Sequence, residues 1–255
     1  MTRLVRATLL LTALLIGCTT EPVIKQEGPD PVRVAQVNTQ LAIEYMKEGK
    51  NEIALERLNR ALQADSNYVD AHMTLGLLYS RLKLDDDAER SFQRALRIDP
   101  ENSLALNNYG QFLCNRGRVD DAMQKFLAAA GNPLYPTPEV ALSNAGTCAL
   151  GDGRIEEAET HLRDALRANP RVAPALLQMA KITFETGRPL PARGYLSRYS
   201  EIAKQTPASL WLAIRVEEAL GDRDALSSYE MLLQNSYPDS DEARQLQLRR
   251  SGSPR

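Results

Sequence analysis

A pattern that recurs every 34 residues constrains this chain more than any other feature of its sequence. In the clearest copy, residues 69–102, Gly76 and Tyr79 belong to a first apolar run, and Ala88 and Phe92 belong to a second. Apolar residues three and four positions apart predict two amphipathic helices. Gly76 and Ala88 are small where the helices would cross, and the larger residues fill the space beside them. A single helical hairpin cannot bury its own apolar face, so similar units must stack on it.

Steps of 34 residues from this copy find five further units in the same phase, with a two-residue excess around Tyr135. The six predicted units are 35–68, 69–102, 103–138, 139–172, 173–206 and 207–238. The fifteenth position, between the paired helices, holds Gly49, Lys83, Gly117, Gly153, Gly187 and Gly221. Five of these are Gly, the residue that most easily ends a helix in a left-handed conformation. An ordinary helical bundle would not keep this phase through the whole chain.

The spacing resembles that of the tetratricopeptide repeat. The resemblance implies an all-α fold, a right-handed superhelical solenoid of six helix-turn-helix units. Residues 239–255 follow the sixth unit, and a short helix from Ser240 to Arg250 is predicted there, with Ser240 or Asp239 as its N-cap. A terminal repeat needs such a helix to cover its apolar face. The last residues, Ser251 to Arg255, are expected to be disordered.

The first 17 residues form a different kind of segment. Arg3 and Arg6 precede an apolar run over residues 7–16, which is shorter than the roughly 20 residues that a membrane span needs. A cleaved export signal is therefore predicted. The sequence Leu-Ile-Gly-Cys ending at Cys18 resembles the bacterial lipobox, which implies that Cys18 is lipidated, with palmitate among its acyl chains. Thr19 rather than Asp follows, which implies sorting to the outer membrane of a Gram-negative bacterium, facing the periplasm. The alternative is an ordinary signal peptide with a chance Cys.

Residues 18–34 are predicted to be a flexible tether that follows the lipidated Cys, because they contain several Pro and no helical periodicity. Removal of residues 1–17 would delete two Arg and no acidic residue. The remaining 29 basic residues would face 33 acidic ones, a formal charge of −4. Such a chain has no electrostatic case for binding nucleic acid.

Two cysteines remain after Cys18. By phase, Cys114 and Cys148 lie on the first helices of units three and four, which are neighbours in this architecture. In an oxidising compartment a disulfide between them is sterically plausible. Two small buried thiols are the alternative, and the sequence leaves both open.

No residue pattern predicts catalysis. The two histidines, His72 and His161, have no metal-ligand spacing, and no CxxC motif or phosphate-binding loop is present. The acidic run Asp85 to Asp87 opens a predicted helix, where it favours the positive end of the helix dipole. We therefore expect neither an enzyme nor a cofactor, metal or small-molecule substrate. A repeat protein with a hidden hydrolase activity is the rival hypothesis, and it lacks a nucleophile paired with a base.

The concave groove of the stack is the predicted binding surface. In tetratricopeptide proteins, positions 2, 5, 9, 12 and 13 of each first helix point into it. The residues predicted to bind a partner are Ile43, Met46, Met73, Leu77, Asn107 and Gln111. Apolar side chains gathered on a surface indicate a partner, and Met adapts to varied peptides. The alternatives are that the first unit packs its own linker there, and that the Asn residues bond between repeats.

A second resemblance is more specific. The run NNYGQFLC at Asn107 to Cys114, the Pro-rich insert around Tyr135 and the Cys at position 148 resemble the type IV pilus biogenesis lipoproteins of the PilF/PilW family. The resemblance covers nearly the whole chain. It implies a pilotin, an outer-membrane lipoprotein that binds the secretin subunit of the pilus machine and promotes its localisation and multimerisation, and hence twitching motility. The alternative is a general periplasmic scaffold for outer-membrane protein assembly or for recruitment of peptidoglycan enzymes.

Overall fold

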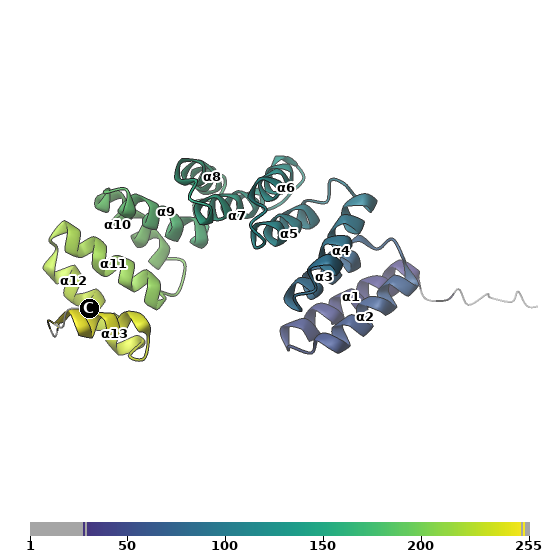
Figure 1. The fold of residues 1–255 in the computed structure, drawn as a ribbon, viewed down its shortest axis with the longest axis horizontal. Coiled ribbons are helices and arrows are strands. Elements are labelled where there is room, and N and C mark those ends of the chain that lie inside the picture. The colour runs from purple at the N-terminus through teal and green to yellow at the C-terminus, as the bar shows by residue number, and fades with distance from the viewer. Residues whose placement is uncertain (1–27, 29, 251, 253–255) are drawn as a thin grey trace, which may run out of the picture.

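The computed structural model describes residue 28, residues 30–250 and residue 252, apart from the side chain of Arg250, and this part of the chain holds thirteen α-helices and no strand. The helices stack in chain order into an arch, with α1 and α13 at its two ends (Figure 1). Their bounds are α1 Pro31–Lys47, α2 Asn51–Ala64, α3 Val69–Arg81, α4 Asp85–Ile98, α5 Ser103–Cys114, α6 Val119–Gly131, α7 Pro138–Gly151, α8 Ile155–Ala168, α9 Ala173–Glu185, α10 Pro189–Ser200, α11 Pro207–Leu220, α12 Arg223–Ser236 and α13 Asp241–Arg250.

The first helix is longer than the sequence predicted. It begins at Pro31, so residues 31–34, assigned above to the flexible tether, are helical. The Asp30 side chain accepts a hydrogen bond from the amide of Val32 at 3.0 Å, and Pro31 occupies the first helical position, where its missing N–H costs nothing. The tether prediction overlooked this start signal. At the other end Ser240 is the N-cap of α13, since its Oγ accepts from the amide of Ala243 at 3.1 Å.

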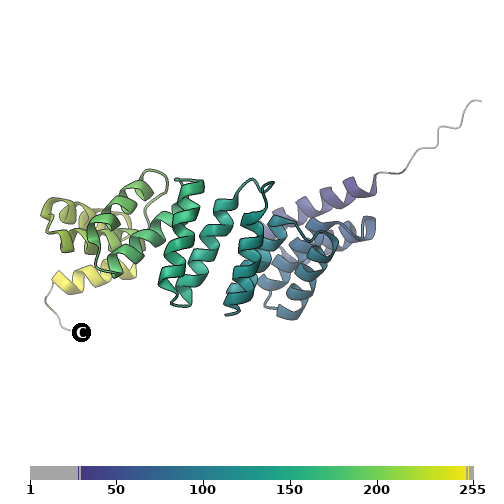
Figure 2. The ribbon, with the colours of Figure 1, turned by 90° about the horizontal axis from the view of Figure 1, so that it is seen from above.

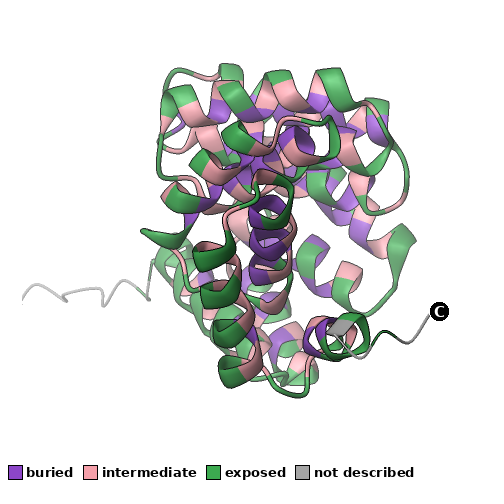
Figure 3. Ribbon diagram, turned by 90° about the vertical axis from the view of Figure 1, so that its left-hand side faces the viewer, coloured by how far each residue is buried: buried purple, intermediate pink, exposed green. Residues whose placement is uncertain are grey.

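The odd-numbered helices α1 to α11 lie on the inside of the arch and the even-numbered helices outside them (Figure 1). Seen from above, the helices lie side by side along the long axis (Figure 2). Buried residues lie where helices face one another, and exposed residues lie on the outer turns (Figure 3). Helices cross closely at Gly76, where a Cβ would lie 2.8 Å from the ring of Phe92, and at Gly146, where it would lie 2.6 Å from Leu162. The core is therefore divided into clusters within and between neighbouring units.

All six predicted turn positions have a positive φ. The five Gly lie between 73° and 78°, and Lys83 adopts 63°. Only Gly enters this region without a steric cost from Cβ. Unit two therefore contains a strained residue at a position where the other units have Gly.

We expect Lys83→Gly to raise the free energy of unfolding by about 0.5–1 kcal/mol. Relief of the left-handed conformation, about 1–2 kcal/mol, exceeds the extra chain entropy of Gly. The exposed Lys side chain loses little packing. Gly117→Ala, at the matching turn of unit three, should lower stability by about 1 kcal/mol. Urea unfolding followed by circular dichroism measures both changes. Stability changes of the same sign in the two variants would contradict the prediction.

The Pro-rich insert between units three and four is fixed to the stack. The side-chain amide of Asn132 donates to the carbonyl of Glu101 at 3.1 Å and to Oγ of Ser103 at 3.0 Å. Tyr135 is buried against Leu106, Ala129 and Ala141. The two extra residues therefore form an ordered bend in which an aromatic ring packs between the units.

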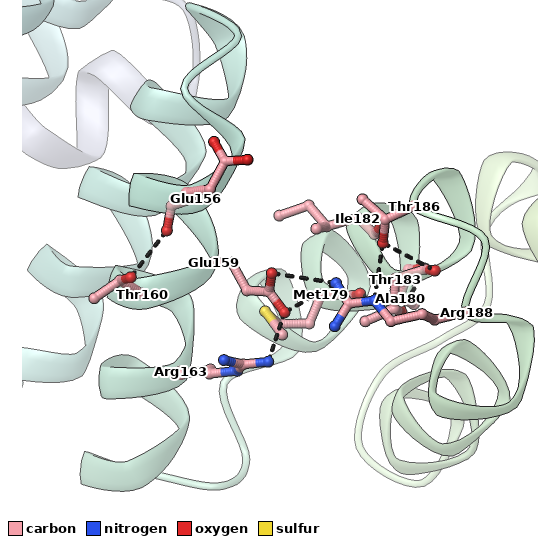
Figure 4. A network of polar contacts seen from close by, with 10 residues as sticks. All are labelled: Glu156, Glu159, Thr160, Arg163, Met179, Ala180, Ile182, Thr183, Thr186 and Arg188. Carbon is pink, nitrogen blue, oxygen red and sulfur yellow. Dashed lines mark hydrogen bonds and ion pairs between the residues drawn. The ribbon is translucent and has the colours of Figure 1, made fainter.

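Arginines at the sixteenth position join units three, four and five to the unit before each. Arg118 lies 2.7 Å from Glu89, Arg154 lies 2.7 Å from Asp120 and Arg188 lies 3.1 Å from Glu159. Glu159 also accepts from Arg163 at 2.6 Å, so one carboxylate holds two guanidinium groups (Figure 4). The Glu159 side chain is 16% exposed, whereas that of Asp120 is 81% exposed. Exposed pairs contribute less than about 1 kcal/mol, so the Glu159 pair is the stronger of these two.

Glu89 is the centre of the network between units two and three. Its carboxylate accepts from the Tyr109 hydroxyl and from Arg118, each at 2.7 Å. Burial alone would raise the pKa of Glu89, but these hydrogen bonds reverse the effect and lower it. Burial and the bond to Glu89 raise the pKa of Tyr109. The pair is therefore an ionised acceptor with a neutral phenol donor at neutral pH.

Candidate functional site

The concave face is formed by the first helix of each unit. In the structure, the residues predicted to line it are exposed, half-buried or, for Asn107, buried. Ile43 and Leu77 are each 37% exposed, and Gln111 is also exposed. Met46 and Met73 are half-buried. The apolar surface available to a partner therefore centres on Ile43 and Leu77, on α1 and α3.

Asn107 does not belong to that surface. It is 7% exposed, and its Oδ1 accepts a hydrogen bond from Asn144 at 2.9 Å, across the interface between units three and four. This is the bond between repeats that the sequence left open as an alternative, and it accounts for an Asn in a helix interior. The prediction that its side chain contacts a partner is replaced by this structural role.

Met73 also packs against the neighbouring unit. Its sulfur lies 3.3 Å from the amide nitrogen of Asn108, and its side chain packs on the cluster that contains Tyr109 and Phe112. On the same helix, Arg81 donates to the carbonyl of Met46. The two methionines therefore flank the exposed residues and link units one, two and three.

The two cysteines of units three and four meet in the centre of the arch. Cys114, at the end of α5, forms a disulfide with Cys148 on α7, with the two Cα atoms 5.9 Å apart. The bond links units three and four across the interface that carries the Pro-rich insert. Of the two arrangements that the sequence left open, the structure contains the disulfide.

One property of the concave face extends beyond the six residues predicted to bind a partner, all of which lie in the first three units. The ninth position changes steadily along the arch from apolar to neutral to cationic, in the order Ile43, Leu77, Gln111, Thr147, Lys181 and Arg215. All six are exposed or half-buried. Continuing the same 34-residue step would have found this gradient. The two ends of the concave face therefore differ in the chemistry that they offer.

A cavity of about 510 Å³ adds to the apolar character of the first two units. It opens where the turn of unit one meets the end of α3, and Ile53, Leu55 and Leu82 contribute its apolar lining. Ile53 and Leu82 are each 38% exposed. Units one and two therefore present apolar side chains both on the concave face and at the neighbouring edge.

The described residues contain no group of three or more His, Cys, Asp or Glu side chains that could hold a metal ion. Among the same residues, no helix has the length and apolar character needed to cross a bilayer. Cys18 and residues 1–17, for which a lipid anchor and an export signal are predicted, lie outside the described part.

Comparison with known proteins agrees with the repeat architecture. Models of the tetratricopeptide repeat match residues 39–103, 91–124 and 149–214. The type IV pilus assembly protein PilF of Pseudomonas aeruginosa is 32% identical over 249 residues, which cover 95% of this chain and 98% of PilF. The chain belongs to the PilF family.

Two solved structures of this family resemble the arch closely. A structure of P. aeruginosa PilF has a TM-score of 0.77 and 30% identity, and covers 86% of this chain and 99% of its own. The structure of PilW, described as a widely conserved type IV pilus biogenesis factor, has a TM-score of 0.75 and 34% identity, and covers 84% and 98%. The PilF family thus shares both the repeats and their superhelical arrangement with this chain.

Proposed function

We propose that this protein acts in type IV pilus biogenesis as a pilotin, a lipoprotein of the outer membrane that binds the pilus secretin and promotes its localisation and multimerisation. The observation that carries the proposal is the similarity to PilF along almost the whole length of both chains. The lipobox-like sequence ending at Cys18 supports the anchor, and the exposed Ile43 and Leu77 support the binding surface.

The mechanism follows from the position of the apolar surface. Secretin subunits that enter the periplasm expose apolar segments, and a segment bound across α1 and α3 would bury both itself and Ile43 and Leu77. A lipid anchor at Cys18 would hold this complex at the membrane where multimers form, which raises the local concentration of subunits. The protein supplies no covalent chemistry in this scheme.

Deletion of the gene tests the proposed function. In cells without it, we expect secretin monomer at the inner membrane and loss of the multimer from isolated outer membranes, measured in unheated samples. A plasmid copy should restore the multimer. Normal multimer in the outer membrane of the deletion strain would exclude the pilotin function and leave a general periplasmic scaffold as the better hypothesis.

Leu77→Asp should weaken binding of the purified secretin subunit at least tenfold. Removal of a buried Leu contact loses about 1.5–3 kcal/mol, and about 1.4 kcal/mol corresponds to a factor of ten. Leu77 is a better test than Met73, because Met73 also packs against α5. The matched control is Leu127→Asp, at a similarly exposed Leu on α6 of the outer row. Unchanged affinity of the Leu77 variant in calorimetry would exclude units one and two as the binding site.

A further inference from the structure

The cationic end of the concave face, which comprises Lys181 and Phe184 on α9 and Trp211 and Arg215 on α11, has no role in the function proposed above. Neither Lys181 nor Arg215 has an acidic partner within residues 30–250. Elsewhere in the stack, arginines such as Arg118 are paired with carboxylates. Two unpaired cations at the ninth positions of consecutive units are therefore available to an external anion.

An aromatic ring holds one of the two cations, Arg215, in place. The Arg215 guanidinium lies over the ring of Phe184, 4.7 Å from its centroid. In the same way, Arg249 of α13 lies 4.5 Å from the Trp211 ring and also contacts Glu218 at 3.3 Å. A guanidinium that stacks through its face keeps the N–H donors at its edge free for a carboxylate. Arg215 is therefore fixed in position, and the N–H donors at its edge have no carboxylate partner in the described part of the chain.

We propose that the cationic end of the concave face binds an acidic peptide segment, with carboxylates on Lys181 and Arg215 and its backbone against Phe184 and Trp211. Charge complementarity is the basis of this assignment, because neither cation forms an ion pair with an acidic side chain of the described residues. The inference does not depend on the secretin being the partner. It adds a second recognition surface at the opposite end of the arch from Ile43 and Leu77.

The shape and charge of the surroundings favour a peptide over other anions. The helices that carry the cations, α9 and α11, lie on the inside of an arch (Figure 1), which a single extended chain can enter and a flat bilayer cannot. Glu185 and Glu218 flank them, and the chain has a formal net charge of −2. A continuous polyanion would meet these acidic residues, whereas a peptide with spaced carboxylates meets only the two cations.

The test uses a fluorescein-labelled synthetic peptide with four Glu residues separated by Ser. Anisotropy measures its binding to the purified protein, and Trp211, the single tryptophan of the chain, gives an independent signal at the proposed site. We expect saturable binding with a change in tryptophan emission, weakening as salt rises. The same peptide with Gln in place of Glu should bind at least tenfold more weakly.

The variants separate this surface from general charge. Lys181→Gln with Arg215→Gln should weaken binding at least tenfold, whereas Arg33→Gln with Arg97→Gln, which removes the same charge from exposed positions on α1 and α4, should leave it within twofold. Lys181→Gln alone touches no packed residue and should still weaken binding severalfold.

Three results would overturn the proposal: equal affinity for the Glu and Gln peptides, wild-type affinity of both the Lys181→Gln and the double variant, or binding of phosphatidylglycerol vesicles without binding of the peptide. Loss of secretin multimers on gene deletion, with no acidic-peptide binding, would reject this inference and leave the pilotin function standing.

Discussion

Reduction of the disulfide between Cys114 and Cys148 is expected to lower the free energy of unfolding by about 3.8 kcal/mol. The two residues are 34 apart in sequence, and the chain-entropy model assigns about that value to a loop of this length. The bond also joins α5 to α7, so its loss removes a covalent link between units three and four. Urea unfolding with and without dithiothreitol, followed by circular dichroism, measures the effect.

A double Cys114→Ala and Cys148→Ala variant is the control for reduction. It should unfold at the same lowered urea concentration as the reduced wild-type protein, and dithiothreitol should not change its midpoint. A wild-type midpoint that is the same in both redox states would show that the stack does not depend on the cross-link.

Gly76→Ala is expected to lower the free energy of unfolding by about 2 kcal/mol, in the range typical of overpacked cores. The new methyl group would lie 2.8 Å from three atoms of the Phe92 ring. That ring is fully buried and stacks 5.5 Å from Tyr109, with Phe112 at 5.6 Å, so it has no space into which to withdraw. The gain in helix propensity from Ala, about 1 kcal/mol, is smaller than the cost of the clash.

Unit one suggests how the clash can be relieved. The same two positions there are occupied by Ala42 and Leu58, both fully buried. Gly76→Ala combined with Phe92→Leu should therefore be at least about 1 kcal/mol more stable than the sum of the single changes. Gly194→Ala, in α10 with no atom within 4 Å of the added methyl, should instead stabilise by about 0.5–1 kcal/mol. Destabilisation by both Gly variants would show that helix crossing is not the cause.

Most of the fold was predictable because the repeat fixes the phase of every helix. The predicted unit starts at 69, 103, 173 and 207 coincide with the observed first residues of α3, α5, α9 and α11, and the unit predicted to start at 139 begins one residue earlier, at Pro138. Small residues and turn glycines recur at fixed positions of the repeat, so the local sequence was sufficient to place the helices of these units. The start of α1 was missed because the capping signal at Asp30 precedes the periodic part of unit one.

The binding surface was less predictable, because exposure depends on contacts between units. Asn107 and Met73 occupy groove positions by phase, yet Asn144 and Asn108 from the following unit cover them. The ion pairs of Arg118, Arg154 and Arg188 join residues 29 or 34 positions apart. A count along one helix cannot identify such partners. The repeat register predicts where a side chain points, and the superhelix decides whether a neighbour reaches it.

Unit one differs from the central units in how it is joined to the stack. Within the described residues, no ion pair links it to unit two, and the arginines that cross this interface donate to uncharged oxygens, Arg81 to the Met46 carbonyl and Arg94 to Asn67 at 2.8 Å. In a linear array of repeats, stability is the sum of each unit and its contacts with its neighbours. Fraying should therefore start at α1 and α2, and their amides should exchange hydrogen faster than those of α5 to α8. A partner that bound across α1 and α3 would act as the missing neighbour and slow that exchange.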